Sequence, residues 1–167
     1  RNATRIREYE EARLMGDVEK AAQYFGVLYA AGIDIPLQIL MDTTGIGSVL
    51  YARRPGDGSA REYAASCQKV LGGIANISVE YATKRYRSNC INWGILPFTN
   101  PDKQIQLAVG EHIYVPGIRR AIAEGSSAVE AMIIGKDGGI RSLRLGLEGL
   151  SEEDRRILLA GGLINYY

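Results

Sequence analysis

The sequence predicts an α/β domain with a mixed sheet, in which parallel βαβ units come first and short antiparallel strands follow. Between residues 46 and 98, strand-like runs rich in β-branched side chains alternate with longer helix-like runs, which is typical of parallel pairing. After Pro101, short apolar runs are joined directly by turns such as Asp137-Gly138-Gly139. Such short connections favour antiparallel strands.

Composition fits one domain. The chain has 167 residues, 46% of them hydrophobic, which is enough for a core of its own. Its 20 basic and 19 acidic residues leave a net charge of +1, so nucleic acid is not an expected partner. No apolar run approaches the ~20 residues of a membrane span, and no leader-like segment is recognised. We therefore expect a cytoplasmic protein that does not bind a membrane.

The N-terminal part is predicted to be mostly helical. Residues 1–16 are charged and favour a peripheral helix. Asp17 can cap a second helix over residues 18–31, which carries an apolar stripe and stops at Gly32. Residues 35–41 are apolar and are interpreted as a strand.

The remaining elements follow from apolar periodicity and from helix and turn signals. Strands are expected at 46–51, 74–79, 95–98, 104–109, 112–115, 129–134 and 140–147, and helices at 61–70, 81–93, 116–124 and 151–160. Gly94 ends the second of these helices, and Pro116 opens the third. The alternation places the segment after residue 51 at the carboxyl end of a strand, where open α/β sheets bind ligands.

That segment contains a glycine-rich turn that runs into a helix. Gly56 and Gly58 allow positive φ angles and a close approach of the backbone to a ligand. Ser59 and Glu62 have the spacing of a capping box, and Arg61 adds positive charge to the first helical turn. An anion fits such a place. A glycine turn before a serine-capped helix also occurs without any ligand, so the spacing alone leaves a structural interpretation open.

Several segments resemble the aconitase family, in the family's order. Gly56-Asp57-Gly58-Ser59-Ala60-Arg61-Glu62 resembles its Gly-x-Gly-Ser-Ser-Arg-Glu loop, and Leu71-Gly72-Gly73 matches a tripeptide that often follows. Arg87-Ser88-Asn89 and Gly94-Ile95-Leu96-Pro97-Phe98 are similar to two later segments, and Ala160 to Tyr167 is similar to the tail of bacterial aconitase-like hydratases. The resemblance implies the family's C-terminal swivelling domain, a compact β/β/α unit. It implies that residues 1–167 are a single domain, expected to be the C-terminal fragment of a longer multidomain enzyme.

The resemblance also assigns roles. Ser59 matches the serine that removes a proton beside a substrate carboxylate, and Arg61 matches the arginine that holds a carboxylate. Gly58 and Ala60 fall at neighbouring substrate-binding positions. The implied activity is that of a hydro-lyase or isomerase, a hydratase or dehydratase acting on a hydroxy di- or tricarboxylic acid. The partners expected are this small acid and the remaining domains of the same polypeptide.

The cysteines limit which cofactor the chain itself can hold. Cys67 and Cys90 lie on predicted helices without metal-ligand or redox spacing, and we expect both to be buried. His112 is the only histidine, and we expect a structural or surface role for it. An aconitase-like [4Fe–4S] cluster needs three cysteine ligands. We therefore expect no cofactor or metal within this chain, the cluster in preceding domains, and an inactive isolated domain.

Some positions depart from the family pattern. The second serine of the loop is Ala60 here, and Tyr63 replaces a histidine that often follows the glutamate. Lys84 and Tyr86 stand near an expected arginine and histidine. The identity of the hydroxy acid is therefore open.

Two alternative functions remain. One is a separately encoded small subunit of an enzyme like isopropylmalate isomerase, which has a similar loop; the aconitase-like tail argues against it. The other is a non-catalytic carboxylate-binding or interaction domain. A second carboxylate-binding arginine has no secure counterpart, although Arg1, Arg5 and Arg7 are candidates.

Overall fold

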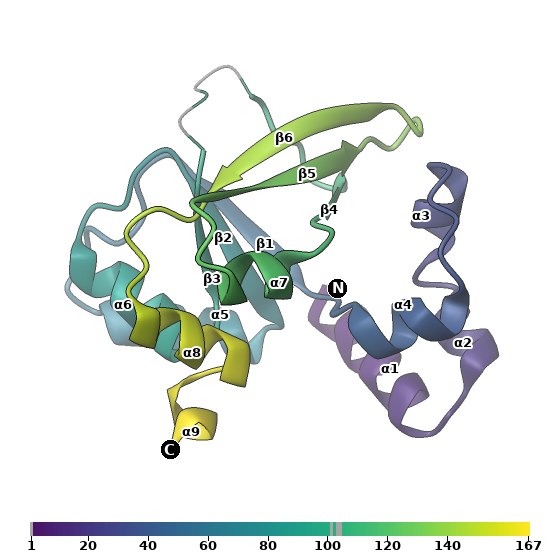
Figure 1. The fold of residues 1–167 in the computed structure, drawn as a ribbon, viewed down its shortest axis with the longest axis horizontal. Helices are drawn as coiled ribbons and strands as arrows, with labels where there is room; N and C mark the ends of the chain where they lie inside the picture. Colours follow the sequence, from purple (N-terminus) through teal and green to yellow (C-terminus); the bar gives the residue numbers. More distant parts are fainter. Residues whose placement is uncertain (1, 101, 103–104) are drawn as a thin grey trace.

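A six-stranded mixed sheet organises the chain in a computed structural model that describes residues 2–100, 102 and 105–167 (Figure 1). The strand order is β1-β2-β3-β6-β5-β4. The strands are β1 (Ser48–Ala52), β2 (Gly73–Ser78), β3 (Leu96–Thr99), β4 (His112–Tyr114), β5 (Ala128–Ile134) and β6 (Ile140–Gly146).

The sheet has a parallel half and an antiparallel half. Strands β1, β2 and β3 are parallel and are connected by α5 (Arg61–Val70) and α6 (Lys84–Asn92). Strands β4, β5 and β6 pair antiparallel, and the halves meet where Thr99 of β3 pairs with Gly146 of β6. This arrangement confirms the predicted fold class, parallel βαβ units first and short antiparallel strands after.

Strand β2 lies between two kinds of surroundings. Ala75 and Ile77 belong to the main hydrophobic core, which collects buried side chains from β3, β5, β6, α7 and α8. The intervening Asn76 is also fully buried, and its side chain contacts α5 and α6 instead. Because successive side chains of a strand point to opposite faces, this alternation fixes the register of β2.

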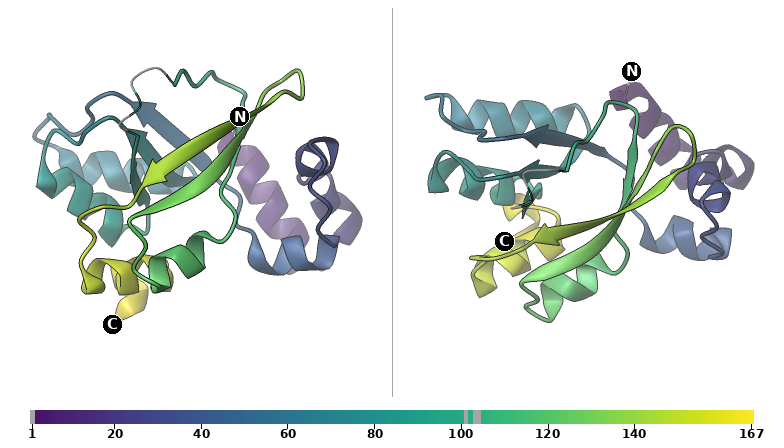
Figure 2. Two further views of the ribbon diagram at one scale, coloured as in Figure 1. Left: turned by 45° about the horizontal axis from the view of Figure 1, so that its top comes forward. Right: turned by 90° about the horizontal axis from the view of Figure 1, so that it is seen from above.

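Three helices complete the C-terminal part. Helix α7 (Ile118–Ala123) packs against β5, and α8 (Glu152–Ala160) packs against both α6 and α7 (Figure 2). The start of α8 carries a capping box in which Ser151 and Asp154 satisfy each other's backbone amides, as its acidic first turn favours. The chain then ends in the short helix α9 (Leu163–Tyr166).

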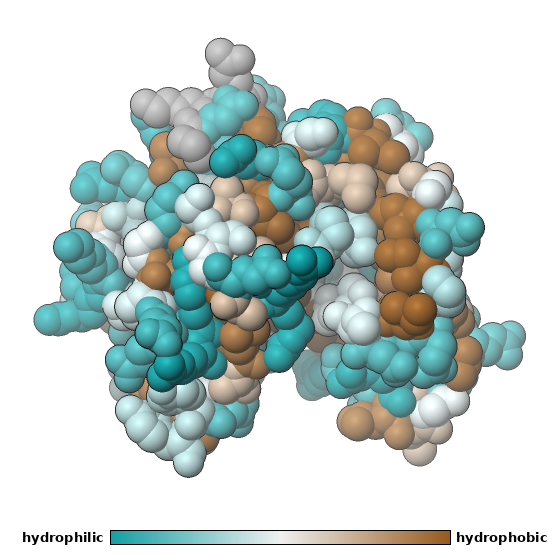
Figure 3. Space-filling view, in the orientation of Figure 1, coloured by the Kyte–Doolittle hydropathy of each residue, from teal (hydrophilic) through white to brown (hydrophobic). Residues whose placement is uncertain are grey.

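The N-terminal helices form a second hydrophobic cluster beside the sheet (Figure 1). They are α1 (Asn2–Leu14), α2 (Val18–Ala22), α3 (Gly26–Ala30) and α4 (Leu37–Thr43). Tyr9 of α1 is fully buried at the centre of this cluster, where its ring meets Tyr24 and Phe25 edge to face. The same part of the chain exposes several large apolar residues, and apolar side chains are visible over these helices in Figure 3.

The structure corrects three element predictions. Residues 35–41, predicted as a strand, enter helix α4 after Pro36, with Leu40 and Met41 buried and Ile39 exposed. A short apolar run does not distinguish a strand from a buried helix by periodicity. The predicted helix over 18–31 is interrupted before Gly26 by turns in which the Tyr24 and Phe25 amides each donate to the carbonyl three residues earlier. No strand forms over 105–109, and residue 104 of that prediction lies outside the described residues.

A close approach of backbones ties the end of α6 to the C-terminal tail. Gly94 has φ +67°, and a Cβ built on it would lie 2.2 Å from the carbonyl oxygen of Gly161. Gly117 has nearly the same φ, +66°, but a Cβ there would meet nothing within 4 Å. A substitution at Gly117 therefore measures the loss of stability due to the left-handed backbone alone. The same substitution at Gly94 adds the loss due to the contact with Gly161.

We expect Gly117→Ala to lower the free energy of unfolding by ~1–2 kcal/mol, because alanine is strained in the left-handed region. Gly94→Ala should lose at least ~2 kcal/mol more, because the methyl group overlaps a backbone carbonyl. Urea unfolding of both variants measures the difference. Equal losses would mean that the approach of Gly94 to Gly161 does not constrain the fold.

Candidate functional site

The glycine-rich loop, residues 53–60, is held against the segment that follows β2. The Glu80 amide donates to the Arg53 carbonyl at 3.2 Å, and the Ala82 amide donates to the Pro55 carbonyl at 2.9 Å. Because β1 and β2 are parallel, both segments lie at the carboxyl end of the strands. The loop therefore occupies the sheet edge at which ligands bind in open α/β folds.

Gly56 is the pivot of this loop. Its φ is +94°, and a Cβ there would lie 2.4 Å from ring atoms of Tyr86. The Gly56 carbonyl accepts two hydrogen bonds, one from Nε of Arg61 at 3.2 Å and one from Oγ1 of Thr83 at 3.4 Å. Only glycine allows the loop to lie this close to the ring while it adopts a left-handed conformation.

The predicted capping box at the start of α5 does not form. The helix begins at Arg61, so Ala60 occupies the N-cap position and no side chain caps the first turn. Ser59 lies one residue too early to cap it. Instead of reaching back, the Glu62 carboxylate accepts a hydrogen bond from Nε1 of Trp93 at 2.6 Å.

This correction leaves the residues of the predicted site accessible. Gly58, Ser59 and Ala60 are exposed, and Arg61 is half-buried. Because α5 has no side-chain cap, the first amides of the helix are not occupied by a neighbouring residue. The loop thus combines an exposed hydroxyl, the positive end of a helix dipole and a guanidinium group, an arrangement suited to a carboxylate.

A buried polar network supports the loop from below. Nδ2 of Asn76 contacts both the Tyr86 hydroxyl and Sγ of Cys90 at 3.3 Å, and Nε2 of Gln68 donates to Oδ1 of Asn76 at 2.5 Å. Burial raises the pKa of Tyr86 to about 12 and that of Cys90 to about 11. Both groups therefore stay protonated near neutral pH. The role of the network here is to hold the Tyr86 ring beneath Gly56.

The cysteines do not fit an iron–sulfur cluster. The prediction that both are buried is wrong for Cys67, which is exposed on α5, whereas Cys90 is buried on α6. No group of three or more His, Cys, Asp or Glu side chains suited to a metal occurs among the described residues. The thiols present could not supply the three thiolates that such a cluster needs.

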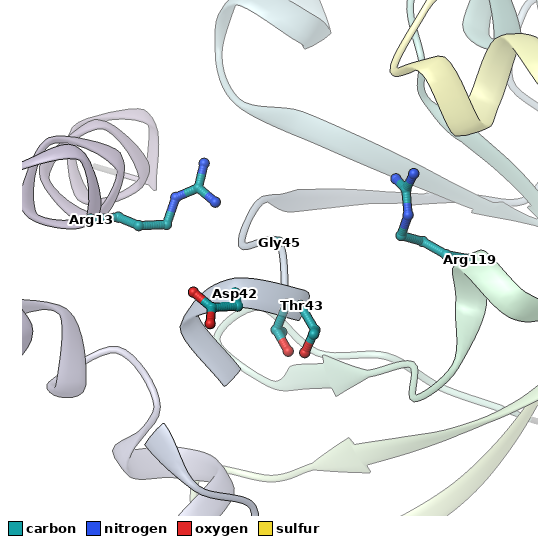
Figure 4. A pocket seen from close by; sticks show the side chains of 6 residues that line it. Arg13, Asp42, Thr43, Gly45 and Arg119 are labelled. Atoms are coloured by element: carbon teal, nitrogen blue, oxygen red, sulfur yellow. The ribbon is translucent and has the colours of Figure 1, made fainter. Parts of the chain in front are cut away.

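A hollow of about 380 Å³ lies away from the loop. It is lined by Arg13, Asp42, Thr43, Thr44, Gly45 and Arg119. In Figure 4 the two arginines extend from opposite walls. Gly45 precedes β1, whereas the glycine-rich loop follows β1, so the two features lie at opposite ends of that strand.

The other candidate residues also lie apart from Ser59. Arg5 and Arg7 belong to α1, whose Ile6 lies beside Gly72 at the amino end of β2. They are therefore at the opposite end of the parallel strands from the loop, and Arg1 lies outside the described residues. His112 is exposed at the start of β4.

Comparison with known proteins finds a likeness among solved structures. No family model matches the chain, and no curated protein matches it. Among solved structures, the chain is similar to 3-isopropylmalate dehydratase from Methanocaldococcus jannaschii, at 28% identity and a TM-score of 0.45. The likeness covers 81% of this chain and 70% of that one. At this TM-score the superposition is loose, so functional inference rests on the chain's own residues.

No helix among the described residues is long and apolar enough to cross a membrane.

The two thiols should differ in reactivity. We expect a thiol reagent such as 5,5′-dithiobis(2-nitrobenzoic acid) to label Cys67 rapidly at pH 8, because that residue is exposed. Cys90 should react only on unfolding, because it is buried and its raised pKa suppresses the thiolate. Kinetics of labelling with and without urea check this, with Cys67→Ser as the control. Two fast thiols in the folded protein would contradict it.

The same network predicts a loss of stability at alkaline pH. Burial raises the pKa of Cys90 from the ordinary thiol value of about 9 to about 11, so the unfolded chain releases that proton first as pH rises. The free energy of unfolding should therefore fall between pH 9 and 11, by at most ~1.4 kcal/mol per pH unit for each such group. Tyr86 contributes in the same direction from pH 10. Urea titrations of Cys90→Ala should give a shallower fall; an unchanged slope would contradict the assignment.

Proposed function

We propose that this chain is the substrate-binding and base-donating unit of an aconitase-like hydro-lyase that acts on a hydroxy di- or tricarboxylic acid. The observation that carries the proposal is the uncapped start of α5. There, exposed Ser59 and half-buried Arg61 stand beside free first-turn amides at the carboxyl end of β1. The aconitase-like sequence of this loop supplies the reaction class.

Arg61 is proposed to hold a substrate carboxylate. Its Nε is engaged by the Gly56 carbonyl at 3.2 Å, which holds the side chain along its own loop. The terminal nitrogens can then make two parallel hydrogen bonds to a planar acid, a geometry that lysine does not offer.

Ser59 is proposed to accept the proton from the carbon beside that carboxylate. A serine hydroxyl is a weak acid, so its alkoxide must be stabilised by nearby positive charge. The α5 dipole, the first-turn amides and Arg61 provide such charge. The electron pair of the broken C–H bond would form a double bond as hydroxide leaves the adjacent carbon.

Groups outside this chain would have to accept the leaving hydroxide. The family resemblance implies a [4Fe–4S] cluster there, in other domains or in a partner polypeptide, and the described cysteines do not fit one. The isolated chain is therefore proposed to bind the acid without turning it over.

Two polypeptide arrangements are compatible with this role. The tail from Ala160 resembles that of single-chain aconitase-like hydratases. The solved structure reported above is named as a 3-isopropylmalate dehydratase, and the alternative for this chain is a separately encoded small subunit of such an enzyme. Sequencing the polypeptide encoded upstream of Arg1 separates the two, because a fused enzyme would carry the three cluster cysteines there.

A non-catalytic carboxylate-binding domain is the second candidate. Ala60 at the N-cap position of α5 and exposed Tyr63 replace polar residues of the family loop. Such a domain would retain binding through Arg61 but would lack turnover after the missing domains are restored.

We expect Arg61→Gln to weaken citrate binding by the 167-residue chain roughly tenfold or more, because it removes a charge-assisted bidentate contact. Isothermal titration calorimetry measures this. Arg53→Gln is the matched control, since it removes the same charge from an exposed position in the same loop. Equal effects of the two substitutions would show that only net charge matters and would overturn the role of Arg61.

We expect Ser59→Ala to change citrate affinity by less than about twofold and to abolish dehydration in the reassembled enzyme. A positioned general base contributes about 10²–10⁴-fold to the rate. The measurement is turnover by the enzyme with its cluster-bearing part restored. Equal rates for Ser59→Ala and the unsubstituted enzyme would exclude the proposed base.

A further inference from the structure

We propose that Thr83 is a positioning residue for this site, and that it acts through the Gly56 carbonyl to fix how Arg61 presents its guanidinium group. The inference rests on the proposed function, because it concerns the carboxylate that Arg61 would hold. Thr83 lies outside the loop, in the segment where Lys84 and Tyr86 stand near an expected arginine and histidine of the family. It lies at the start of α6, 27 residues from Gly56 in sequence.

The Thr83 hydroxyl takes part in two hydrogen bonds, one as acceptor and one as donor. As the N-cap of α6 it accepts a hydrogen bond from the Tyr86 amide at 3.2 Å. A hydroxyl has one proton to donate, and here the hydroxyl donates to the Gly56 carbonyl, with 3.4 Å between the two oxygens. Because the cap fixes the oxygen relative to α6, the donated bond fixes the carbonyl relative to α6.

The Gly56 carbonyl needs this restraint. Glycine rotates with little steric resistance, so the peptide between Gly56 and Asp57 is free to turn unless something holds it. The Tyr86 ring blocks movement of the Gly56 α-carbon to one side, since a Cβ there would lie 2.4 Å from ring atoms. The backbone bond from Ala82 to Pro55 holds the preceding residue. Thr83 supplies the restraint on the carbonyl itself.

The orientation of that carbonyl decides which edge of Arg61 faces a ligand. A guanidinium group can hold a carboxylate side-on, through Nε and one terminal nitrogen, or end-on, through both terminal nitrogens. Since Nε of Arg61 already donates to Gly56 at 3.2 Å, the side-on edge is occupied. The carboxylate must therefore bind end-on, in line with the guanidinium and away from the loop backbone.

The test compares three variants of the 167-residue chain, with citrate as the probe. Thr83→Val keeps the shape but loses both hydrogen bonds, whereas Thr83→Ser keeps them. Ser151→Ala is the matched control, because it removes a helix cap of the same kind at α8, where the capping hydroxyl accepts from the Asp154 amide and holds no loop carbonyl. Calorimetry should show Thr83→Val binding citrate roughly fivefold more weakly, with Thr83→Ser and Ser151→Ala within about twofold of the unsubstituted chain.

A second readout does not depend on binding. Proton exchange at Arg61 Nε, followed by ¹⁵N NMR, should be slow in the unsubstituted chain and in Thr83→Ser, and several-fold faster in Thr83→Val. Equal exchange in all three would overturn the inference even if citrate does not bind at all, an outcome that would separately reject the proposed function. Equal losses of affinity in Thr83→Val and Ser151→Ala would also overturn it, because they would reduce the effect to a lost cap.

Discussion

The contact between Gly56 and the Tyr86 ring is the constraint on which the rest of the site depends. It forces a left-handed glycine into the loop after β1 and brings the Gly56 carbonyl within reach of α6. Tyr86 can serve as this platform because its hydroxyl is held by Asn76, a fully buried amide in the middle of β2. A polar residue inside a parallel strand is costly unless it is satisfied. Here it connects the sheet to the loop that carries Ser59.

The starts of α5, α6 and α8 differ in whether a side chain caps the first turn. Helix α8 is closed by a capping box at Ser151, and α6 is capped by Thr83. Helix α5 has alanine at its N-cap and no side-chain cap. A helix end without such a partner leaves donors to be satisfied by solvent or by a ligand. Helices α3, α4, α7 and α9 also lack a side-chain cap, but α5 is the one that follows the exposed, glycine-rich loop at the carboxyl end of β1, which makes its start the candidate site.

Local periodicity predicted much of the fold. The bounds of α5 agree with the sequence, as does the division of the sheet into parallel and antiparallel halves, because long amphipathic runs and glycine stops carry strong local signals. The prediction of a strand over residues 35–41 was wrong, because packing of Leu40 and Met41 against the N-terminal helices selects a helix over a strand. The prediction that Cys67 is buried was also wrong, because the sequence does not show which side of α5 is covered. A side chain's position around a helix gains meaning only when its neighbours are known.

The sequence by itself determined where in the chain the candidate site lies. Its glycines, serine and arginine stand at a strand-to-helix junction, and that combination predicts an anion-binding loop. Only the tertiary structure decided how the site is built. Ser59 does not form the cap that its spacing to Glu62 suggested, because α5 begins at Arg61, and the Glu62 carboxylate is engaged instead by Trp93, 31 residues beyond Glu62. Arg61 is aligned by a carbonyl that Thr83 restrains from another helix. Spacing along the chain describes which groups can meet, but competing partners distant in sequence determine which ones do.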